Sequence, residues 1–188
     1  MTKGILVIGG PNGAGKTTAA KELLPSRLSV SEFLNADEIA RGLSPFNPDH
    51  AAISAGRFML ARMQTLVAQN TSFAFETTCA GLSQLRLLNV CKANDWQVAL
   101  IFLWLPSPDE AMRRVARRVL QGGHDIPEHV IVRRYWAGLR NLHEHYLPLA
   151  DVAIIYDNSD DGRRLVAERV PGAELRIHDT VRWSKMSC

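Results

Sequence analysis

The sequence predicts an α/β protein built on a mostly parallel sheet of five strands, with helices on both faces. Apolar segments typical of strands alternate with longer segments of helical periodicity along the 188 residues. The first strand-like segment, residues 4–10, leads directly into a glycine-rich stretch and then into a helix-like one. The apolar run at 97–106 is typical of a central strand buried on both faces. Since no linker or repeat interrupts these elements, we expect one domain over residues 1–188.

Each predicted element has a local signal. Strands are expected at 4–10, at the start of 32–40, and at 71–78, 97–106 and 151–159. Helices are expected at 16–24 (ended by Pro25), at 49–69, 82–94 and 108–120, and from Pro127 onward. The segment 160–188 is a C-terminal extension, and its residues 173–186 predict a terminal hairpin.

The helix at 49–69 shows how such elements are recognised. Asn47 can cap it, and Pro48 occupies the first helical position, where a missing N–H is harmless. One apolar face is predicted to contain Ala52, Ala55, Met59, Met63 and Leu66. The later helices are expected to bury Met112, Val115 and Val119, and then Ile131, Tyr135, Leu139 and Leu142.

Composition excludes several classes of protein. The net charge is only +3, so the whole chain is not a polyelectrolyte that binds nucleic acid through its charge. No apolar run approaches the ~20 residues of a membrane-spanning helix, and the apolar stretch 5–8 is too short for a signal peptide. The chain has only three cysteines, and their positions do not have the spacing of metal ligands: Cys79, Cys91 and Cys188. Such sparse cysteines fit a reducing compartment. We therefore expect a soluble cytoplasmic protein without a membrane partner.

The stretch GGPNGAGKTT contains the P-loop pattern Gly-x-x-x-x-Gly-Lys-Thr, beginning at Gly10. Its glycines let backbone N–H groups point at a phosphate, and the following helix directs its positive end to the same place. Lys16 is expected to reach the terminal phosphates of ATP, and the Thr17 hydroxyl to hold Mg²⁺. The predicted nucleotide-binding residues are Gly10, Pro11, Asn12, Gly13, Ala14, Gly15, Lys16, Thr17 and Thr18.

A P-loop alone does not define the reaction. A GTPase would normally carry an Asn-Lys-x-Asp motif that reads guanine, and the sequence has none. The segment LSQLR at 82–86 does not match the Leu-Ser-Gly-Gly-Gln signature of transporter ATPases. Both absences favour a small-molecule kinase.

Asp37 follows a short strand, at the sheet edge where ligands bind in doubly wound folds. A carboxylate there can orient an acceptor hydroxyl beside the γ-phosphate and accept its proton. The alternative is that Asp37 only caps a helix. Arg41, one turn later, is expected either to face the same cleft and bind substrate or to form an i,i+4 pair.

Glu76 ends another predicted strand, in the segment FETT. A carboxylate at the end of an apolar strand costs free energy unless it is paired. Glu76 could therefore hold a Mg²⁺-bound water or a substrate hydroxyl, although it could also simply close the strand. Thr77 could add a hydroxyl contact to substrate, but threonine after a strand is commonly a turn residue.

The segment RRVLQGGHDIPEHVIVRR, residues 117–134, places a loop with two adjacent glycines between two pairs of arginines. The surrounding stretch 113–140 holds seven arginines and two acidic residues. Arginines that neutralise developing charge are a main source of rate in phosphoryl transfer, and a closing loop excludes water. This pattern predicts a lid over an anion, with a solvated helix face as the alternative for any single arginine.

Four segments together resemble the zeta-toxin-like P-loop kinases. They are GGPNGAGKTT, NADEIAR, FAFETT and GGHDIPEHVIVRRY, in that order, and the resemblance spans roughly residues 4–158. It implies a strand order of 2-3-1-4-5 and a mobile lid. It also implies that Lys16 and Thr17 hold ATP and Mg²⁺, that Asp37 is the catalytic base, and that Glu76 positions a sugar substrate. Arg118, with Arg133 or Arg134, would stabilise the transferred phosphoryl group.

In that family the acceptor is the N-acetylglucosamine moiety of UDP-N-acetylglucosamine, so the resemblance implies a sugar nucleotide substrate and allows an antitoxin protein as partner. The chain is shorter than the long toxins, which leaves the acceptor open. Two alternatives stay open as well. One is a nucleotide or polynucleotide kinase, for which Tyr135 and Trp136 give little stacking support, so we do not expect a nucleic acid partner. The other is a non-enzymatic, nucleotide-gated, toxin-like binding module.

Overall fold

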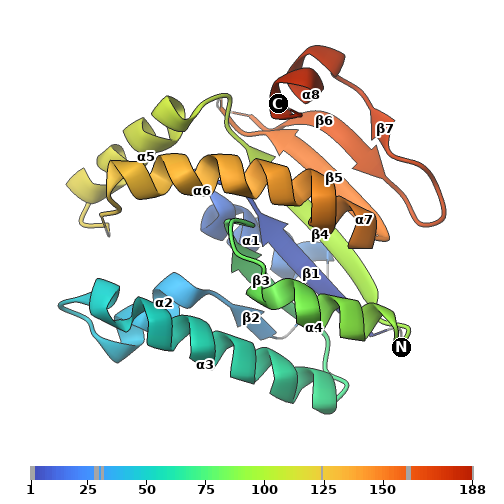
Figure 1. The fold of residues 1–188 in the computed structure, drawn as a ribbon, viewed down its shortest axis with the longest axis horizontal. Coiled ribbons are helices and arrows are strands. Elements are labelled where there is room, and N and C mark those ends of the chain that lie inside the picture. The colour runs from blue at the N-terminus through green and yellow to red at the C-terminus, as the bar shows by residue number, and fades with distance from the viewer. Residues whose placement is uncertain (1–2, 28–29, 31, 124, 160–161, 188) are drawn as a thin grey trace.

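A seven-stranded sheet forms the centre of the protein, as Figure 1 shows for the computed structural model. The structure describes residues 3–27, 30, 32–123, 125–159 and 162–187. The strand order is β2-β3-β1-β4-β5-β6-β7. The strands are β1 (Gly4–Gly9), β2 (Glu32–Leu34), β3 (Phe73–Thr77), β4 (Gln97–Trp104), β5 (Val152–Asp157), β6 (Arg164–Arg169) and β7 (Arg176–Ile177).

Helices pack on both faces of this sheet, with α1 behind it and α4 and α6 in front in the view of Figure 1. The first four helices are α1 (Lys16–Arg27), α2 (Ala36–Leu43), α3 (Pro48–Ala68) and α4 (Ser83–Lys92). The later ones are α5 (Pro108–Leu120), α6 (Glu128–Asn141), the π-helical turn η1 (Leu142–Tyr146), α7 (Leu147–Leu149) and α8 (Thr180–Met186). None of the described helices is both long and apolar enough to cross a membrane.

Strand β1 shows why the sheet is covered on both sides. Its side chains alternate between the two faces, as the period of two in a strand requires. Leu6 and Ile8 pack with Ala20 of α1, whereas Ile5 and Val7 belong to the larger core on the opposite face. A strand buried on both sides must be apolar throughout, and β1 is.

The parallel register brings the functional segments to one edge of the sheet. Ile8 of β1 lies beside Glu76 of β3, and Gly9 lies beside Thr77. Since β2 runs parallel to β3, its carboxyl end reaches the same edge. The P-loop after β1, the segment after β2 and the end of β3 therefore meet in space, although Gly9 and Thr77 lie nearly 70 residues apart in sequence.

The predicted order 2-3-1-4-5 is confirmed for the five parallel strands. The expected count of five strands was too low, because β6 and β7 extend the sheet in antiparallel fashion beyond β5. The terminal hairpin expected at 173–186 is also wrong. β7 pairs back to β6 instead, and residues 180–186 form α8.

Two further expectations need correction. α1 does not end at Pro25 but continues to Arg27. On α3, Ala52 is exposed and Ala51 is buried in its place, while Ala55, Met59, Met63 and Leu66 are buried as predicted. In the later helices Met112 and Val119 are only half-buried, and the other predicted inward residues are buried. Residue 124 of the predicted lid, and 160–161 and 188 of the C-terminal extension, lie outside the described residues.

Candidate active site

The P-loop between β1 and α1 depends on glycines at two close approaches. Gly10 has φ +144°, and a Cβ atom on it would lie 2.3 Å from the Leu103 carbonyl oxygen. Gly13 has φ +77°, and a Cβ there would lie 2.9 Å from the Ala111 carbonyl oxygen of α5. No residue with a side chain fits either position, so the loop conformation follows from the sequence pattern.

A residue far along the chain holds the P-loop in place. Asn158, directly after β5, donates a hydrogen bond from Nδ2 to the Ala14 carbonyl oxygen at 2.8 Å. The backbone N–H of Asn158 donates in turn to the Trp104 carbonyl oxygen at the end of β4. Neighbouring strand ends therefore support the loop, and sequence reasoning had not assigned this contact.

Lys16 is buried at the start of α1, with 7% of its surface exposed. Its ammonium group donates to the Pro11 carbonyl oxygen at 2.9 Å and lies 3.9 Å from Glu76 Oε1. Burial lowers the pKa of Lys16, and the nearby carboxylates of Glu76 and Asp37 only partly oppose this effect. The site therefore holds a desolvated cation that an additional anion would stabilise.

Glu76 is tied to both of its neighbouring segments. One carboxylate oxygen, Oε2, accepts hydrogen bonds from Thr17 Oγ1 and from Asn35 Nδ2, each at 2.8 Å. The expectation that this carboxylate would be paired is thus met by three groups: the Thr17 hydroxyl, the Asn35 amide and the Lys16 ammonium. Asn35 was not singled out from the sequence, although an asparagine just before a helix with acidic first-turn residues is a typical N-cap.

Asn35 also bears on the interpretation of Asp37 as a helix cap. The Asn35 side-chain oxygen accepts hydrogen bonds from the backbone N–H groups of Asp37 and Glu38, so Asn35 is the cap of α2. Asp37 contributes only its backbone N–H to this cap, and its side chain lines a cavity beside Lys16. The capping alternative for the Asp37 carboxylate is therefore wrong.

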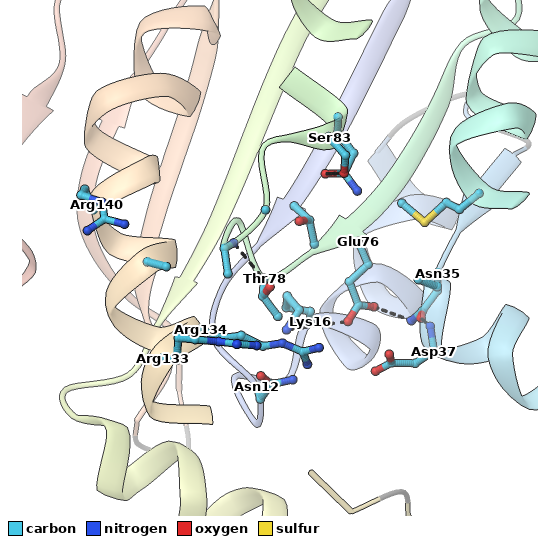
Figure 2. Close-up of a pocket in the computed structure, with 17 residues that line it drawn as sticks. Asn12, Lys16, Asn35, Asp37, Glu76, Thr78, Ser83, Arg133, Arg134 and Arg140 are labelled. Atoms are coloured by element: carbon cyan, nitrogen blue, oxygen red, sulfur yellow. Dashed lines mark hydrogen bonds and ion pairs between the residues drawn. The ribbon is translucent and has the colours of Figure 1, made fainter. Parts of the chain in front are cut away.

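A cavity of about 580 Å³ opens between the P-loop, the carboxyl ends of β2 and β3, and α6 (Figure 2). Most of its lining side chains are polar or charged. The lining residues are Asn12, Lys16, Asn35, Ala36, Asp37, Met59, Glu76, Thr77, Thr78, Ala80, Gly81, Ser83, Gln84, Arg133, Arg134, Ala137 and Arg140. Of the predicted site residues, the cavity brings together Asn12, Lys16, Asp37, Glu76, Thr77, Arg133 and Arg134.

Several predicted site residues lie elsewhere. Arg41 pairs with Glu38 at 2.7 Å and lines a smaller adjoining pocket of about 120 Å³, which shares Asp37 and Arg134 with the main cavity. Seven of the predicted nucleotide-binding residues do not line the main cavity: Gly10, Pro11, Gly13, Ala14, Gly15, Thr17 and Thr18. Of these, Thr18 is exposed. Thr77 lines the cavity, but its hydroxyl also accepts a hydrogen bond from the Cys79 N–H at 3.0 Å, as a turn residue would.

The arginines around the predicted lid fall into different environments. Arg113 and Arg114 both pair with Glu110, an acid just outside the stretch that the sequence had suggested was nearly acid-free. Arg118, on the last turn of α5, does not line the cavity, although its charge adds to the lowering of the Lys16 pKa by burial. Arg133 and Arg134 extend from α6 across the cavity toward the P-loop side in Figure 2.

Helix α6 is packed firmly against the segment that follows β3. A Cβ atom on Gly138 would lie 2.5 Å from the Thr78 carbonyl oxygen, so helix and backbone are in close contact. Asn141 donates from Nδ2 to the Cys79 carbonyl oxygen at 2.8 Å, and Tyr135 donates to the Leu105 carbonyl oxygen at 2.6 Å. The arginines at the start of α6 therefore project from an anchored helix.

The oxygen atoms near the P-loop fit a magnesium ion. Mg²⁺ prefers oxygen ligands and usually takes only one or two from protein, the rest coming from phosphates and water. The Thr17 hydroxyl and the Glu76 carboxylate, 2.8 Å apart, are such a pair. Among the described residues no group of three or more His, Cys, Asp or Glu side chains could hold a metal ion unaided.

The glycine-rich phosphate loop lies at the carboxyl edge of a parallel sheet covered by helices. This arrangement defines the chain as a P-loop protein with a kinase-like fold. The chain belongs to the AAA domain family, whose family model matches residues 5–134. This span contains the P-loop, Asp37, Glu76, Arg133 and Arg134, but not Arg140, the third arginine of α6 that lines the cavity.

Known proteins share sequence or fold with this chain. An uncharacterized protein of Haemophilus influenzae is 30% identical over 126 residues, covering 67% of this chain and 88% of the relative. The AvrRxo1-ORF1:AvrRxo1-ORF2 complex with sulphate ions contains a chain with TM-score 0.75 and 16% identity, over 99% of this chain and 64% of that one. This chain thus spans less than two thirds of the AvrRxo1 chain.

Two further structures share the fold. The AvrRxo1 complex with ATP gives a TM-score of 0.72 at 15% identity, over 99% of this chain and 64% of that chain. A structure of the PezAT chromosomal toxin–antitoxin system of Streptococcus pneumoniae gives 0.60 at 17% identity, over 89% of this chain and 72% of that chain. At these identities the similarity shows the fold.

Proposed function

We propose that this chain is a Mg²⁺-dependent phosphotransferase that moves the γ-phosphate of ATP to a hydroxyl of a small acceptor, a sugar nucleotide such as UDP-N-acetylglucosamine. The observation that carries the proposal is the lining of one cavity. It places the carboxylate of Asp37 in the same space as the P-loop lysine Lys16, together with Glu76. A carboxylate not used for helix capping, beside a phosphate-binding lysine, suits the transfer of a phosphoryl group to a hydroxyl.

In this proposal the P-loop binds the nucleotide. The backbone N–H groups of residues 10–15 and the positive end of α1 surround the phosphates, and the Lys16 ammonium bonds to their terminal oxygens. The desolvation that lowers the pKa of Lys16 makes an anionic ligand favourable there. Thr17 and Glu76 would hold Mg²⁺, which when bound neutralises charge on the phosphates.

Asp37 is the proposed catalytic base. Its carboxylate hydrogen-bonds the acceptor hydroxyl and takes its proton as the hydroxyl oxygen bonds to the γ-phosphorus. The bond from that phosphorus to the bridging oxygen breaks, and ADP leaves. Arg133 and Arg134, from the anchored α6, offset the charge on the transferred group. Arg118 is a weaker candidate for this role, since it does not line the cavity.

The direct test is phosphoryl transfer from labelled ATP to UDP-N-acetylglucosamine, with Asp37→Asn as the diagnostic variant. The substitution keeps the backbone N–H that Asn35 caps, so α2 should stay folded. We expect transfer to fall by about 10²–10⁴-fold, the usual contribution of a general base, with ATP binding unchanged. Asp95→Asn, on an exposed turn outside the cavity, is the matched control.

If the Asp37→Asn variant transfers the phosphoryl group at the wild-type rate, Asp37 is not the catalytic base. Phosphorylation of other small acceptors but not of UDP-N-acetylglucosamine would overturn the substrate alone. An oligonucleotide with a free 5′-hydroxyl belongs in the same assay, since its phosphorylation would favour a polynucleotide kinase instead.

A protein partner forms a second part of the proposal. Its support is that two similar folds were solved as the AvrRxo1-ORF1:AvrRxo1-ORF2 complex and as the PezAT toxin–antitoxin system. If the chain is a toxin controlled by a partner, its expression alone should arrest growth and Asp37→Asn should not. Equal growth with both proteins would argue against such a role.

A further inference from the structure

The cavity extends from the P-loop to the second half of α6. Its reacting end contains Lys16, Asp37 and Glu76, whereas Ser83 and Arg140 lie away from these residues in Figure 2. Arg133, Ala137 and Arg140 share one face of α6 at intervals of four and three residues. At 1.5 Å per residue, Arg140 lies about 10 Å along the helix from Arg133.

The two ends of the cavity differ in charge. Both acidic lining residues, Asp37 and Glu76, stand at the reacting end. The rest of the wall, made by the segment after β3, the start of α4 and the second half of α6, contributes no acidic side chain and one cation, Arg140. Arg140 forms no hydrogen bond or ion pair with any described residue, in contrast to Arg113 and Arg114, which share Glu110.

A second observation indicates that the cavity is shaped for a ligand. Asn12 is only 6% exposed and lines the cavity, yet its side-chain oxygen has no hydrogen-bond partner among the described residues. A buried acceptor without a partner is unfavourable, and a donor group of a bound molecule would relieve this. A hydroxyl or amide N–H at the reacting end is such a donor.

From these features we infer that the acceptor carries a phosphate or carboxylate group at the end of the cavity away from Asp37, and that Arg140 binds this group. Arg140 is thus a specificity-determining residue at the distal end of the cavity, where Ser83 and Gln84 also contribute polar side chains to the lining. This inference rests on the proposed function, because it assigns the reacting hydroxyl to the Asp37 end.

The test compares three probes that share one sugar: N-acetylglucosamine, N-acetylglucosamine 1-phosphate and UDP-N-acetylglucosamine. Their binding is measured by calorimetry with the P-loop occupied by a non-hydrolysable ATP analogue and Mg²⁺. We expect the wild type to prefer the phosphate-bearing probes. Arg140→Gln should weaken their binding about ten- to hundredfold, the range for a hydrogen bond to a charged group, and leave the neutral sugar and the ATP analogue unaffected. Arg86→Gln, an exposed arginine on α4 outside the cavity, controls for loss of net charge.

Equal binding of neutral and phosphorylated sugars by the wild type would overturn the inference. So would equal affinities of wild type and Arg140→Gln, or failure of both phosphorylated probes to bind the wild type. Failure of the proposed function has a different signature. In that case the phosphorylated probes bind in an Arg140-dependent manner, but none of them receives a phosphoryl group from ATP.

Discussion

Replacement of Gly138 by alanine tests the close packing of α6 on the segment after β3. The added Cβ would lie 2.5 Å from the Thr78 carbonyl oxygen, where real Cβ atoms essentially never come within 3.0 Å. Overpacking of this kind costs about 1–3 kcal/mol, while alanine in place of glycine in a helix returns about 1 kcal/mol. We therefore expect Gly138→Ala to lower the free energy of unfolding by up to about 2 kcal/mol.

The matched control is Gly56→Ala in α3. A Cβ there meets nothing within 4 Å, so only the helical preference remains and the free energy of unfolding should rise by about 0.5–1 kcal/mol. Urea unfolding followed by circular dichroism measures both variants. For a chain of this size each kcal/mol corresponds to about 2–4 °C in Tm.

Catalysis supplies a second measurement for the same variant. If α6 must shift to accept the methyl group, its arginines move with it, and a displacement of about 1 Å can cost about 10²-fold in rate. The binding of ATP at the P-loop should change much less. A Gly138→Ala protein as stable as Gly56→Ala would refute the close contact between α6 and Thr78.

Three other predictions concern separate contacts. Asn158→Ala removes the hydrogen bond to the Ala14 carbonyl, so ATP affinity measured by calorimetry should fall by about three- to tenfold, and an unchanged affinity would show that the loop holds its shape unaided. Glu76→Gln removes the negative charge beside Lys16 and should weaken the Mg²⁺ dependence of nucleotide binding in a magnesium titration, whereas an unaltered titration would remove Glu76 from the ion site. Burial lowers the pKa of His143 below 6.5, against the opposing effect of its hydrogen bond with the Met186 carbonyl. The folded state then binds fewer protons than the unfolded state, so part of the stability is lost as pH falls below about 6.5, and His143→Gln should flatten this part of the stability–pH curve.

Much of the fold could be predicted from sequence because its signals are local. The apolar runs, the P-loop glycines, the proline at the start of α3 and the Ser107 cap of α5 depend on nearby residues, although the Asn47 side chain does not form the expected cap of α3. The parallel order of the five strands agreed with the resemblance. The extension of the sheet was missed because β7 has only two residues, both exposed, and β6 has charged residues at both ends. Such strands carry little periodicity, and their pairing is decided by distant partners.

The candidate site was predictable to a different degree for each residue. Asp37 and Glu76 were found because polar residues at strand ends meet at one edge of a parallel sheet. The roles of Asn35 and Asn158 were not predicted, because each depends on a hydrogen bond to a residue far away in sequence. The pairing of Arg113 and Arg114 with Glu110 likewise shows that a count of charges over a window does not reveal which cations are available.

The contacts at the end of β5 bear on how far the nucleotide-binding unit extends. Asp157 is 4% exposed, and its carboxylate accepts a hydrogen bond from Arg182 Nε of α8 at 2.6 Å. The next residue, Asn158, supports the P-loop. The family match ends at residue 134, yet the P-loop is supported by Asn158, and the neighbouring Asp157 is held in turn by Arg182 of α8. A fragment trimmed to the matched span would therefore expose the edge of β4 and lose a support of its phosphate loop, so a minimal expression fragment should extend through α8.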